Sequence, residues 1–392
     1  MTLEDIKKID NDYHMPTYAR FDLLLVKGHG ATAYDEKGKE YIDFSSGIGV
    51  NSLGFCDKEY VADVTAQLST LGHTSNLFYT EPQALLAESI CTKTGYSKVF
   101  FSNSGAEANE CAIKLARKYS FDNYGEGRNE IITLLNSFHG RTVTTLSATG
   151  QDVFHNYFFP FTDGFQHGSS DCVNSIKSLI TEKTCAVMIE PILGEGGVLP
   201  LEQKFVTELS ALCKEQNLLL ICDEVQTGVG RTGKLLAQEH FDLKADIVTL
   251  AKGLGGGLPI GACLCNEKLE KTLSASMHAT TFGGNPVVCA GALHVLKKVS
   301  SPQFLEEVCK KGDYIKQKIL AIDGVSDVRG LGLMLGIILK KDNARQVVEK
   351  CINEGLIALT AKTLVRFLPP LTISYDELDQ GMERFEKAVS QD

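Results

Sequence analysis

Residues 218–252 read LLLICDEVQTGVGRTGKLLAQEHFDLKADIVTLAK, and this stretch contains two short apolar runs. The runs LLLIC (218–222) and IVTL (247–250) have the length of β-strands and are apolar at consecutive positions, as strands buried on both faces are. Asp223 directly follows the first run, and Lys252 stands shortly after the second. Because ligands bind at the carboxyl ends of strands in open α/β sheets, this stretch predicts an acid and an amine at one such edge.

Further apolar runs of strand length lie on both sides of this stretch. They are Lys98–Phe101, Ile131–Leu135, Ala186–Ile189 and Ile260–Cys265. Longer segments between the runs have helical spacing, as in 202–216, where Phe205, Leu209 and Leu212 recur on one face. This alternation predicts an α/β fold with a mainly parallel central sheet and helices on both faces.

The two ends of the chain have a different pattern. Residues 24–44 alternate between apolar and polar and contain a glycine turn, which predicts hairpins. Towards the C-terminus helical patterns dominate, and 324–339 is then expected to form strands around two glycines. We therefore expect a large domain over 46–288 and a smaller α+β domain built from 1–45 and 289–392.

The composition excludes several classes of protein. The 392 residues include 39 Lys and Arg against 49 Asp and Glu, which gives a formal charge of −10. With 43% hydrophobic and 22% charged residues, the chain has the composition of a globular protein and not of a disordered one. The acidic balance argues against a nucleic-acid partner, which would require a basic surface.

The N-terminus and the cysteines bear on the compartment. The first residues, MTLEDIKKID, have no apolar core of a secretory signal, and no apolar run approaches the ~20 residues that span a bilayer. The 12 cysteines are scattered and form no CxxC pair, so we expect neither a metal site nor a disulfide framework. Reduced thiols in the cytoplasm, with no membrane partner, are the expectation that follows.

The segment SNSGAEAN (102–109) follows the strand run KVFF. Ser104 and Glu107 have the spacing of a capping box, so a helix is expected to begin here. A turn of small residues at a helix N-terminus exposes N–H groups that can hold an anion. An ordinary capped turn is the simpler interpretation of this segment taken alone.

Two glycine-rich segments are similar to nucleotide-binding loops. Residues 228–234 fit the G-x-x-x-x-G-K part of a phosphate loop, but Leu235 stands where the motif needs Ser or Thr for magnesium. Residues 28–33 lie in an expected hairpin and not in a βαβ unit, as a dinucleotide fingerprint would require. Both segments therefore argue against a nucleotide-binding module.

Asp223 and Lys252 each have an ordinary structural interpretation. A buried Asp at a strand end is usually hydrogen-bonded or paired with a cation, and one lysine among many carries little information. An Asp can also pair with the protonated ring nitrogen of a cofactor, and a lysine with a lowered pKa can act as a nucleophile. Together with an anion-holding helix N-terminus, the two residues describe a pyridoxal phosphate site. Phe138, Arg141 and Thr281 supply a ring to stack, a cation for a carboxylate and a donor for a phosphate.

These residues belong to longer motifs. The most specific is DEVQTGVGRTG (223–233), which is followed by AKGLGGG (251–257) and TFGGNP (281–286). Further motifs extend from YDEKGKEYIDF (34–44) to RFLPP (366–370). On these residues the sequence resembles the class III aminotransferases over nearly its whole length. The resemblance implies a pyridoxal-phosphate-dependent transferase of fold type I that works as a homodimer with shared active sites.

The resemblance also implies roles for the cofactor-binding residues. Lys252 is expected to carry the cofactor and to move the proton of the reaction, and Asp223 to keep the ring nitrogen protonated. Gln226 is expected to bind the phenolic oxygen, and Phe138 and Val225 to enclose the ring. The phosphate ligands implied are Ser104, Gly105 and Ala106, with Thr281 donated by the second subunit.

Within the family, the motifs SGAEAN (104–109), FHGRT (138–142) and GEGG (194–197) are most similar to those of enzymes that act on N2-acetylornithine in arginine biosynthesis. This implies N2-acetylornithine and 2-oxoglutarate/glutamate as small-molecule substrates. The substrate-binding residues implied are Tyr18, Arg141, Glu195, Thr280 and Arg366, and Glu195 is expected to mask Arg366 in one half-reaction. One departure is Ile192-Leu193, where relatives commonly have a glutamine before the Gly-Glu pair.

Several alternatives stay open at this point. Ornithine, succinyldiaminopimelate or 4-aminobutyrate can replace N2-acetylornithine as the amino donor without a change in the cofactor motifs. A non-catalytic protein that senses a ligand on the same fold is a further alternative, against which the intact pair of Asp223 and Lys252 argues.

Overall fold

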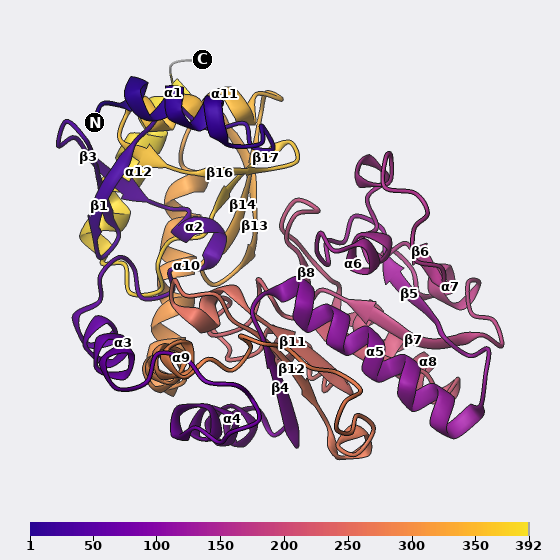
Figure 1. The fold of residues 1–392 in the computed structure, drawn as a ribbon. Coiled ribbons are helices and arrows are strands. Elements are labelled where there is room, and N and C mark those ends of the chain that lie inside the picture. The colour runs from indigo at the N-terminus through magenta and orange to yellow at the C-terminus, as the bar shows by residue number, and fades with distance from the viewer. Residues whose placement is uncertain (391–392) are drawn as a thin grey trace.

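The computed structural model describes residues 1–390, which contain a seven-stranded central sheet (Figure 1). In spatial order its strands are β4 (Lys98–Ser102), β12 (Gly261–Cys265), β11 (Ile247–Leu250), β10 (Leu219–Asp223), β7 (Thr184–Ile189), β5 (Glu130–Leu134) and β6 (Phe165–Gly168). All six expected apolar runs are strands of this sheet. The seventh strand, FQHG, was missed because it is short and carries polar residues.

The central sheet is mainly parallel, as expected, with one reversed strand. Four neighbouring pairs run parallel, whereas β12 runs antiparallel to both β11 and β4. Residues 251–260 connect β11 to β12, and they contain only the short helix η3 (Lys252–Gly255). A parallel crossover needs about a dozen residues or more, so this connection can only return the chain beside the strand that it leaves.

Helices cover both faces of the central sheet. Alternate residues of each strand point to opposite faces, and because both sets are apolar, both faces must be buried. Ala186 and Met188 of β7 share a hydrophobic cluster with α5 (Gly105–Tyr124), whereas Val187 and Ile189 pack in the cluster that includes α8 (Gln203–Glu215). Helix α5 lies across the front of the sheet in Figure 1. The helix expected over 202–216 is confirmed as α8.

Two smaller sheets contain the ends of the chain. One is β1 (Leu25–His29), β2 (Thr32–Asp35), β3 (Glu40–Asp43) and β15 (Leu356–Ile357). The other is β13 (Val325–Leu331), β14 (Met334–Leu339), β17 (Leu364–Phe367) and β16 (Leu359–Ala361). The hairpins expected over 24–44 and the strands expected over 324–339 are confirmed. The pairing of Leu356 with Ile42 joins segments from the two ends of the chain.

The remaining elements surround these sheets. The longer helices are α1 (Leu3–Tyr13), α3 (Lys58–Thr70), α4 (Glu81–Thr94), α9 (Pro286–Val299), α10 (Pro302–Leu320), α11 (Ala344–Asn353) and α12 (Tyr375–Ser390). The short elements are α2 (Ser46–Gly49), α6 (Val143–Ala148), η1 (Asp152–Phe154), α7 (Val173–Lys177), β8 (Ile192–Leu193), β9 (Leu199–Pro200), η2 (Ala237–Phe241) and η4 (Glu267–Leu269). The expected boundary at 288 falls inside α9, and the division into two domains stays a prediction.

Among residues 1–390, no helix is both long enough and apolar enough to cross a bilayer.

Candidate active site

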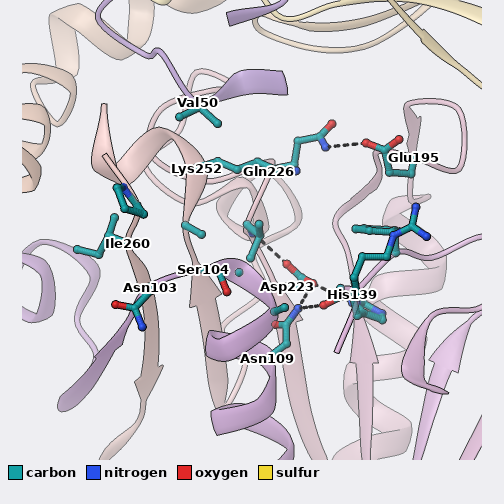
Figure 2. A pocket seen from close by; sticks show the side chains of 18 of the residues that line it. Val50, Asn103, Ser104, Asn109, His139, Glu195, Asp223, Gln226, Lys252 and Ile260 are labelled. Atoms are coloured by element: carbon teal, nitrogen blue, oxygen red, sulfur yellow. Dashed lines mark hydrogen bonds and ion pairs between the residues drawn. The ribbon is translucent and has the colours of Figure 1, made fainter. Parts of the chain in front are cut away.

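A cavity of about 440 Å³ lies at the carboxyl edge of the central sheet. Its size is in the range of pockets that bind small ligands. Most of the expected site residues line it: Ser104, Gly105, Ala106, Phe138, Arg141, Glu195, Asp223, Val225, Gln226 and Lys252. Figure 2 shows Lys252 and Asp223 on walls of this one cavity. The strands bring them together because β10 and β11 are parallel neighbours that end at the same edge.

Asp223 is the last residue of β10 and is 4% exposed. Its Oδ2 accepts a hydrogen bond from Nδ2 of Asn109 at 2.7 Å and lies 2.8 Å from Nδ1 of His139. Its Oδ1 accepts one from the backbone N–H of Val225 at 3.0 Å. These contacts hold the carboxylate in one orientation, and Oδ1 can accept a further donor.

A second layer of contacts fixes Asn109 under Asp223 (Figure 2). The Asn109 side chain donates to the backbone oxygen of His139 at 2.7 Å and accepts from the hydroxyl of Thr249 at 2.7 Å. Thr249 is on β11, so the network ties α5 to two strands of the sheet. Sequence reasoning did not assign a role to Asn109 or His139, because their common partner Asp223 is far away along the chain.

Lys252 begins the turn after β11 and has a left-handed backbone, with φ of 42°. Burial lowers the pKa of its ammonium group, and the positive charge of Arg366 adds to this, whereas the carboxylates of Glu195 and Asp223 oppose it. A lysine with a lowered pKa holds more of its amine neutral and is therefore a better nucleophile.

The N-terminus of α5 forms another wall of the cavity. Ser104 caps the helix by accepting a hydrogen bond from the backbone N–H of Glu107 at 3.2 Å. The expected capping box is only half formed, because the Glu107 carboxylate accepts from the N–H of Asn103 and not from that of Ser104. The N–H groups of Gly105 and Ala106 are in the first turn, where they have no acceptor within the helix and can bind an anion.

Glu195 and Arg366 form an ion pair beside the cavity. Nη1 of Arg366 lies 2.6 Å from Oε1 of Glu195 and 3.2 Å from Oε1 of Gln226. The Gln226 amide completes the triangle with a 3.4 Å contact to Glu195, which is drawn as a dashed line in Figure 2. Burial opposes the ionisation of Glu195, but the charges of Arg366 and Lys252 outweigh it and hold the pKa of this carboxyl below its usual range.

Arg366 lies on β17 and is 3% exposed. It does not line the cavity itself but contacts Glu195 and Gln226, which do. The departure at Ile192-Leu193 lies next to this triangle, in β8. A side chain at Gly194 would clash with Gln226, because its Cβ would lie 2.7 Å from Oε1. Glycine at 194 therefore leaves the space that the Gln226 side chain occupies.

Besides Arg366, three expected residues do not line the cavity. Tyr18 is 74% exposed, and its ring lies under the guanidinium of Arg20 at 5.5 Å. Thr281 is exposed on the surface of its own chain. The hydroxyl of Thr280 accepts a 3.3 Å hydrogen bond from Asn103, which does line the cavity.

Glu190 is a further buried acid that sequence reasoning missed. It accepts hydrogen bonds from the N–H groups of Phe138 at 2.8 Å and Gly194 at 3.3 Å. Burial raises the pKa of Glu190 to about 7; the charge of His139 opposes this rise and that of Asp223 adds to it. The available signal was the apolar run Ala186–Ile189, which ends in an acid as the run before Asp223 does.

The residues fit pyridoxal phosphate in the chemistry of their donor sets. Asp223 can pair with a protonated ring nitrogen, and the amine of Lys252 lines the same cavity. The N–H groups at the start of α5 suit a phosphate, and Phe138 and Val225 can enclose a flat ring. Among residues 1–390, no group of three or more His, Cys, Asp or Glu side chains is arranged to hold a metal ion.

Comparisons with known proteins agree with this site. A family model described as "Aminotransferase class-III" matches residues 13–389. An acetylornithine aminotransferase of Haemophilus ducreyi is 50% identical and is covered over 100% of both chains. Another, of Methanocaldococcus jannaschii, is 43% identical over 97% of this chain and 96% of its own length.

Solved structures are similar over the same length. The ornithine aminotransferase of Toxoplasma gondii ME49 has a TM-score of 0.95 at 31% identity, covering 100% of this chain and 96% of its own. The N-acetylornithine aminotransferase of Stenotrophomonas maltophilia K279a has a TM-score of 0.85 at 35% identity, covering 98% of both chains.

Proposed function

The chain belongs to the class-III aminotransferase family, and we propose that it moves the terminal amino group of N2-acetylornithine to 2-oxoglutarate. The products are N-acetylglutamate 5-semialdehyde and glutamate, a reaction of arginine biosynthesis. The observation that carries the proposal is the pair of Asp223 and Lys252 in one cavity, with Arg141 on its wall and Arg366 behind it. Full-length relatives named acetylornithine aminotransferase, at 43–50% identity, support this choice of substrate.

Pyridoxal phosphate, when bound, supplies an electron sink that stabilises negative charge on the carbon bearing the transferred nitrogen. We expect Ser104, Gly105 and Ala106 to hold its phosphate and Asp223 to hold its ring nitrogen. Phe138 and Val225 would enclose the ring, and Gln226 would bind its phenolic oxygen. The bonds that Asn109 and Val225 donate to Asp223 support the second of these roles, because they keep that carboxylate aimed in one direction.

Lys252 has two tasks in this proposal. Its amine would hold the cofactor, and its Nζ would move a proton at the substrate carbon that loses nitrogen. Both tasks need a neutral amine, and the burial that lowers the pKa of Lys252 supports this state.

Glu195 and Arg366 account for two different substrates in one pocket. The terminal carbon of N2-acetylornithine bears no carboxylate, so Arg366 can stay neutralised by Glu195 in this half-reaction. The reacting carbon of glutamate bears a carboxylate, which requires a free cation, and Glu195 must then turn away from Arg366. Arg141 is the second cation, available for the carboxylate that lies farther from the reacting carbon.

The acids of the cavity favour an acylated donor over free ornithine. Glu190, Glu195 and Asp223 are the acids that line it among residues 1–390, and each already has partners in the folded chain. None of them is therefore free to pair with the α-ammonium group of ornithine. The amide of N2-acetylornithine carries no charge and needs no such partner.

We also propose a homodimer with shared active sites. Leu77, Phe78 and Tyr79 form an exposed apolar segment beside Thr280 and Thr281, and Phe282 is exposed next to them. Asn76 ties the two segments together by donating to the backbone oxygen of Gly283 at 2.8 Å. Exposed apolar patches of this kind mark protein contacts, and a contact here would bring Thr281 to the partner's cofactor. A cytoplasmic location stays a prediction from the cysteine pattern.

A panel of half-reactions tests the proposed function. Enzyme in the pyridoxal form is mixed separately with N2-acetylornithine, ornithine, succinyldiaminopimelate and 4-aminobutyrate, and conversion to the amine form is followed by absorbance. We expect the largest second-order rate constant with N2-acetylornithine. If this compound is the poorest donor, the proposed substrate is wrong, and absence of conversion with every donor would contradict the transaminase role.

A further inference from the structure

We propose that Phe154 is a positioning residue that holds Arg141 ready for the substrate carboxylate. The proposal rests on the proposed function, in which Arg141 binds a carboxylate, and it adds a residue that does not line the cavity. Phe154 ends the short helix η1, which follows the motif containing Phe138 and Arg141.

Two aromatic rings lie against the guanidinium of Arg141. Its Cζ lies 4.0 Å from the ring centre of Phe154 and 5.3 Å from that of Phe138. The two rings meet edge to face, with centres 6.0 Å apart and planes at 74°. Within residues 1–390, these rings are the contacts that hold the guanidinium, and no carboxylate pairs with it.

Hydrogen bonds on both sides fix the backbone that carries Phe154. Gln151, just before η1, donates from its side chain to the backbone oxygen of Ser137 at 3.0 Å. His155, just after it, lies with Nε2 2.8 Å from the backbone oxygen of Leu146 in α6. Because Ser137 directly precedes Phe138, the two rings are attached to one hydrogen-bonded unit.

Arg141 and Arg366 are therefore prepared in different ways. Arg366 is neutralised by Glu195 at 2.6 Å and must lose that partner before it binds a substrate. Arg141 rests against rings, which leave the N–H groups at its edge free for a bidentate contact with a carboxylate. An arginine side chain has about 2 kcal/mol of rotamer entropy, so a ring that limits its motion lowers the entropic cost of binding.

The test replaces Phe154 by Leu, which removes the flat ring and keeps an apolar side chain. We expect Phe154→Leu to raise KM for N2-acetylornithine about 2-fold to 30-fold, the range that the loss of one cation–π contact implies. The kcat should stay within about twofold, because Lys252 and Asp223 are untouched. Phe154→Tyr keeps the ring and should restore the wild-type KM.

A donor without the carboxylate separates positioning from general damage. N-Acetylputrescine has the same acylated amine chain as N2-acetylornithine but lacks the carboxylate, so Phe154→Leu should leave its kcat/KM unchanged. Phe158→Leu is the matched control. Phe158 is exposed on the same segment, and its ring contacts Tyr157 and not Arg141. In an Arg141→Met background, Phe154→Leu should have no further effect on KM.

The outcomes distinguish this proposal from the proposed function. Wild-type enzyme that does not convert N2-acetylornithine contradicts the function, and Phe154→Leu is then tested with another donor by measuring KM for the oxo-acid acceptor. This KM should also rise, since the two carboxylates of 2-oxoglutarate need both arginines. An unchanged KM in Phe154→Leu, or an equal loss with N2-acetylornithine and N-acetylputrescine, overturns the positioning role.

Discussion

Nη1 of Arg366 lies 2.6 Å from Oε1 of Glu195, and this pair joins a strand from the C-terminal part of the chain to the hairpin turn beside the central sheet. The guanidinium is almost fully buried, so its charge depends on Glu195 for neutralisation. In the proposed function this pair is closed for N2-acetylornithine and open for glutamate.

Glu195→Gln should change the balance between the two half-reactions. The amide keeps the shape but cannot neutralise Arg366, so we expect the half-reaction with N2-acetylornithine to slow about tenfold, equivalent to about 1.4 kcal/mol. The half-reaction with glutamate should change less, because Glu195 must leave Arg366 there in any case. Stopped-flow absorbance on each half-reaction measures both rates. Glu208→Gln on the surface of α8 is the control, and equal rates in variant and wild type would exclude a mask.

Lys252→Ala should remove both the resting covalent link to the cofactor and the group that moves the proton. We expect the rate of transamination to fall at least about 100-fold, as for the loss of a positioned general base. The visible absorbance band of lysine-linked cofactor should disappear as well. Lys271→Ala, at an exposed lysine, should retain both properties. A Lys252→Ala enzyme that keeps the band would show that another amine carries the cofactor.

Asn109→Ala should destabilise the fold of the cofactor-free protein. The substitution removes one donor from the buried Asp223 and the acceptor of the Thr249 hydroxyl. We expect a loss of about 1–3 kcal/mol in the free energy of unfolding, the usual range for an unsatisfied buried polar group. Urea unfolding monitored by circular dichroism measures it. Asn156→Ala, on an exposed loop, is the control, and an equal effect of both variants would contradict the network.

Glu190 should make stability depend on pH. Burial raises the pKa of Glu190 from 4.5 to about 7 in the folded chain. Between these values the unfolded chain has released this proton while the folded chain retains it, so stability falls as pH rises through the window. We expect Glu190→Gln to flatten this fall, because the amide does not titrate. Urea midpoints at about pH 5 and about pH 8 test it, with Glu208→Gln expected to keep the wild-type slope. If the urea midpoint of Glu190→Gln falls with pH as steeply as that of the wild type, the pH dependence belongs to another group.

Features of the fold that depend on residues close along the chain could be predicted from the sequence, and features that depend on distant residues could not. Six strands of the central sheet were visible as apolar runs, because burial on both faces leaves a local pattern. The reversed direction of β12 was not visible, because it depends on how the chain returns to pair with β11. The half-formed capping box at Ser104 and Glu107 is a similar case, since a neighbouring N–H competes for the same carboxylate.

By itself, the sequence determined that Asp223 and Lys252 each stand at the carboxyl end of a buried strand. This could be predicted because each residue is close along the chain to the apolar run that forms its strand. It also showed Arg141 and Arg366 as two cations of the same kind. The family resemblance implied Glu195 as a partner of Arg366, and the two side chains are in contact in the structure. Only the tertiary structure decided that Arg141 rests against the ring of Phe154. The partner of a charged side chain is set by packing between distant segments, and this packing decides whether the charge is neutralised or left free for a substrate.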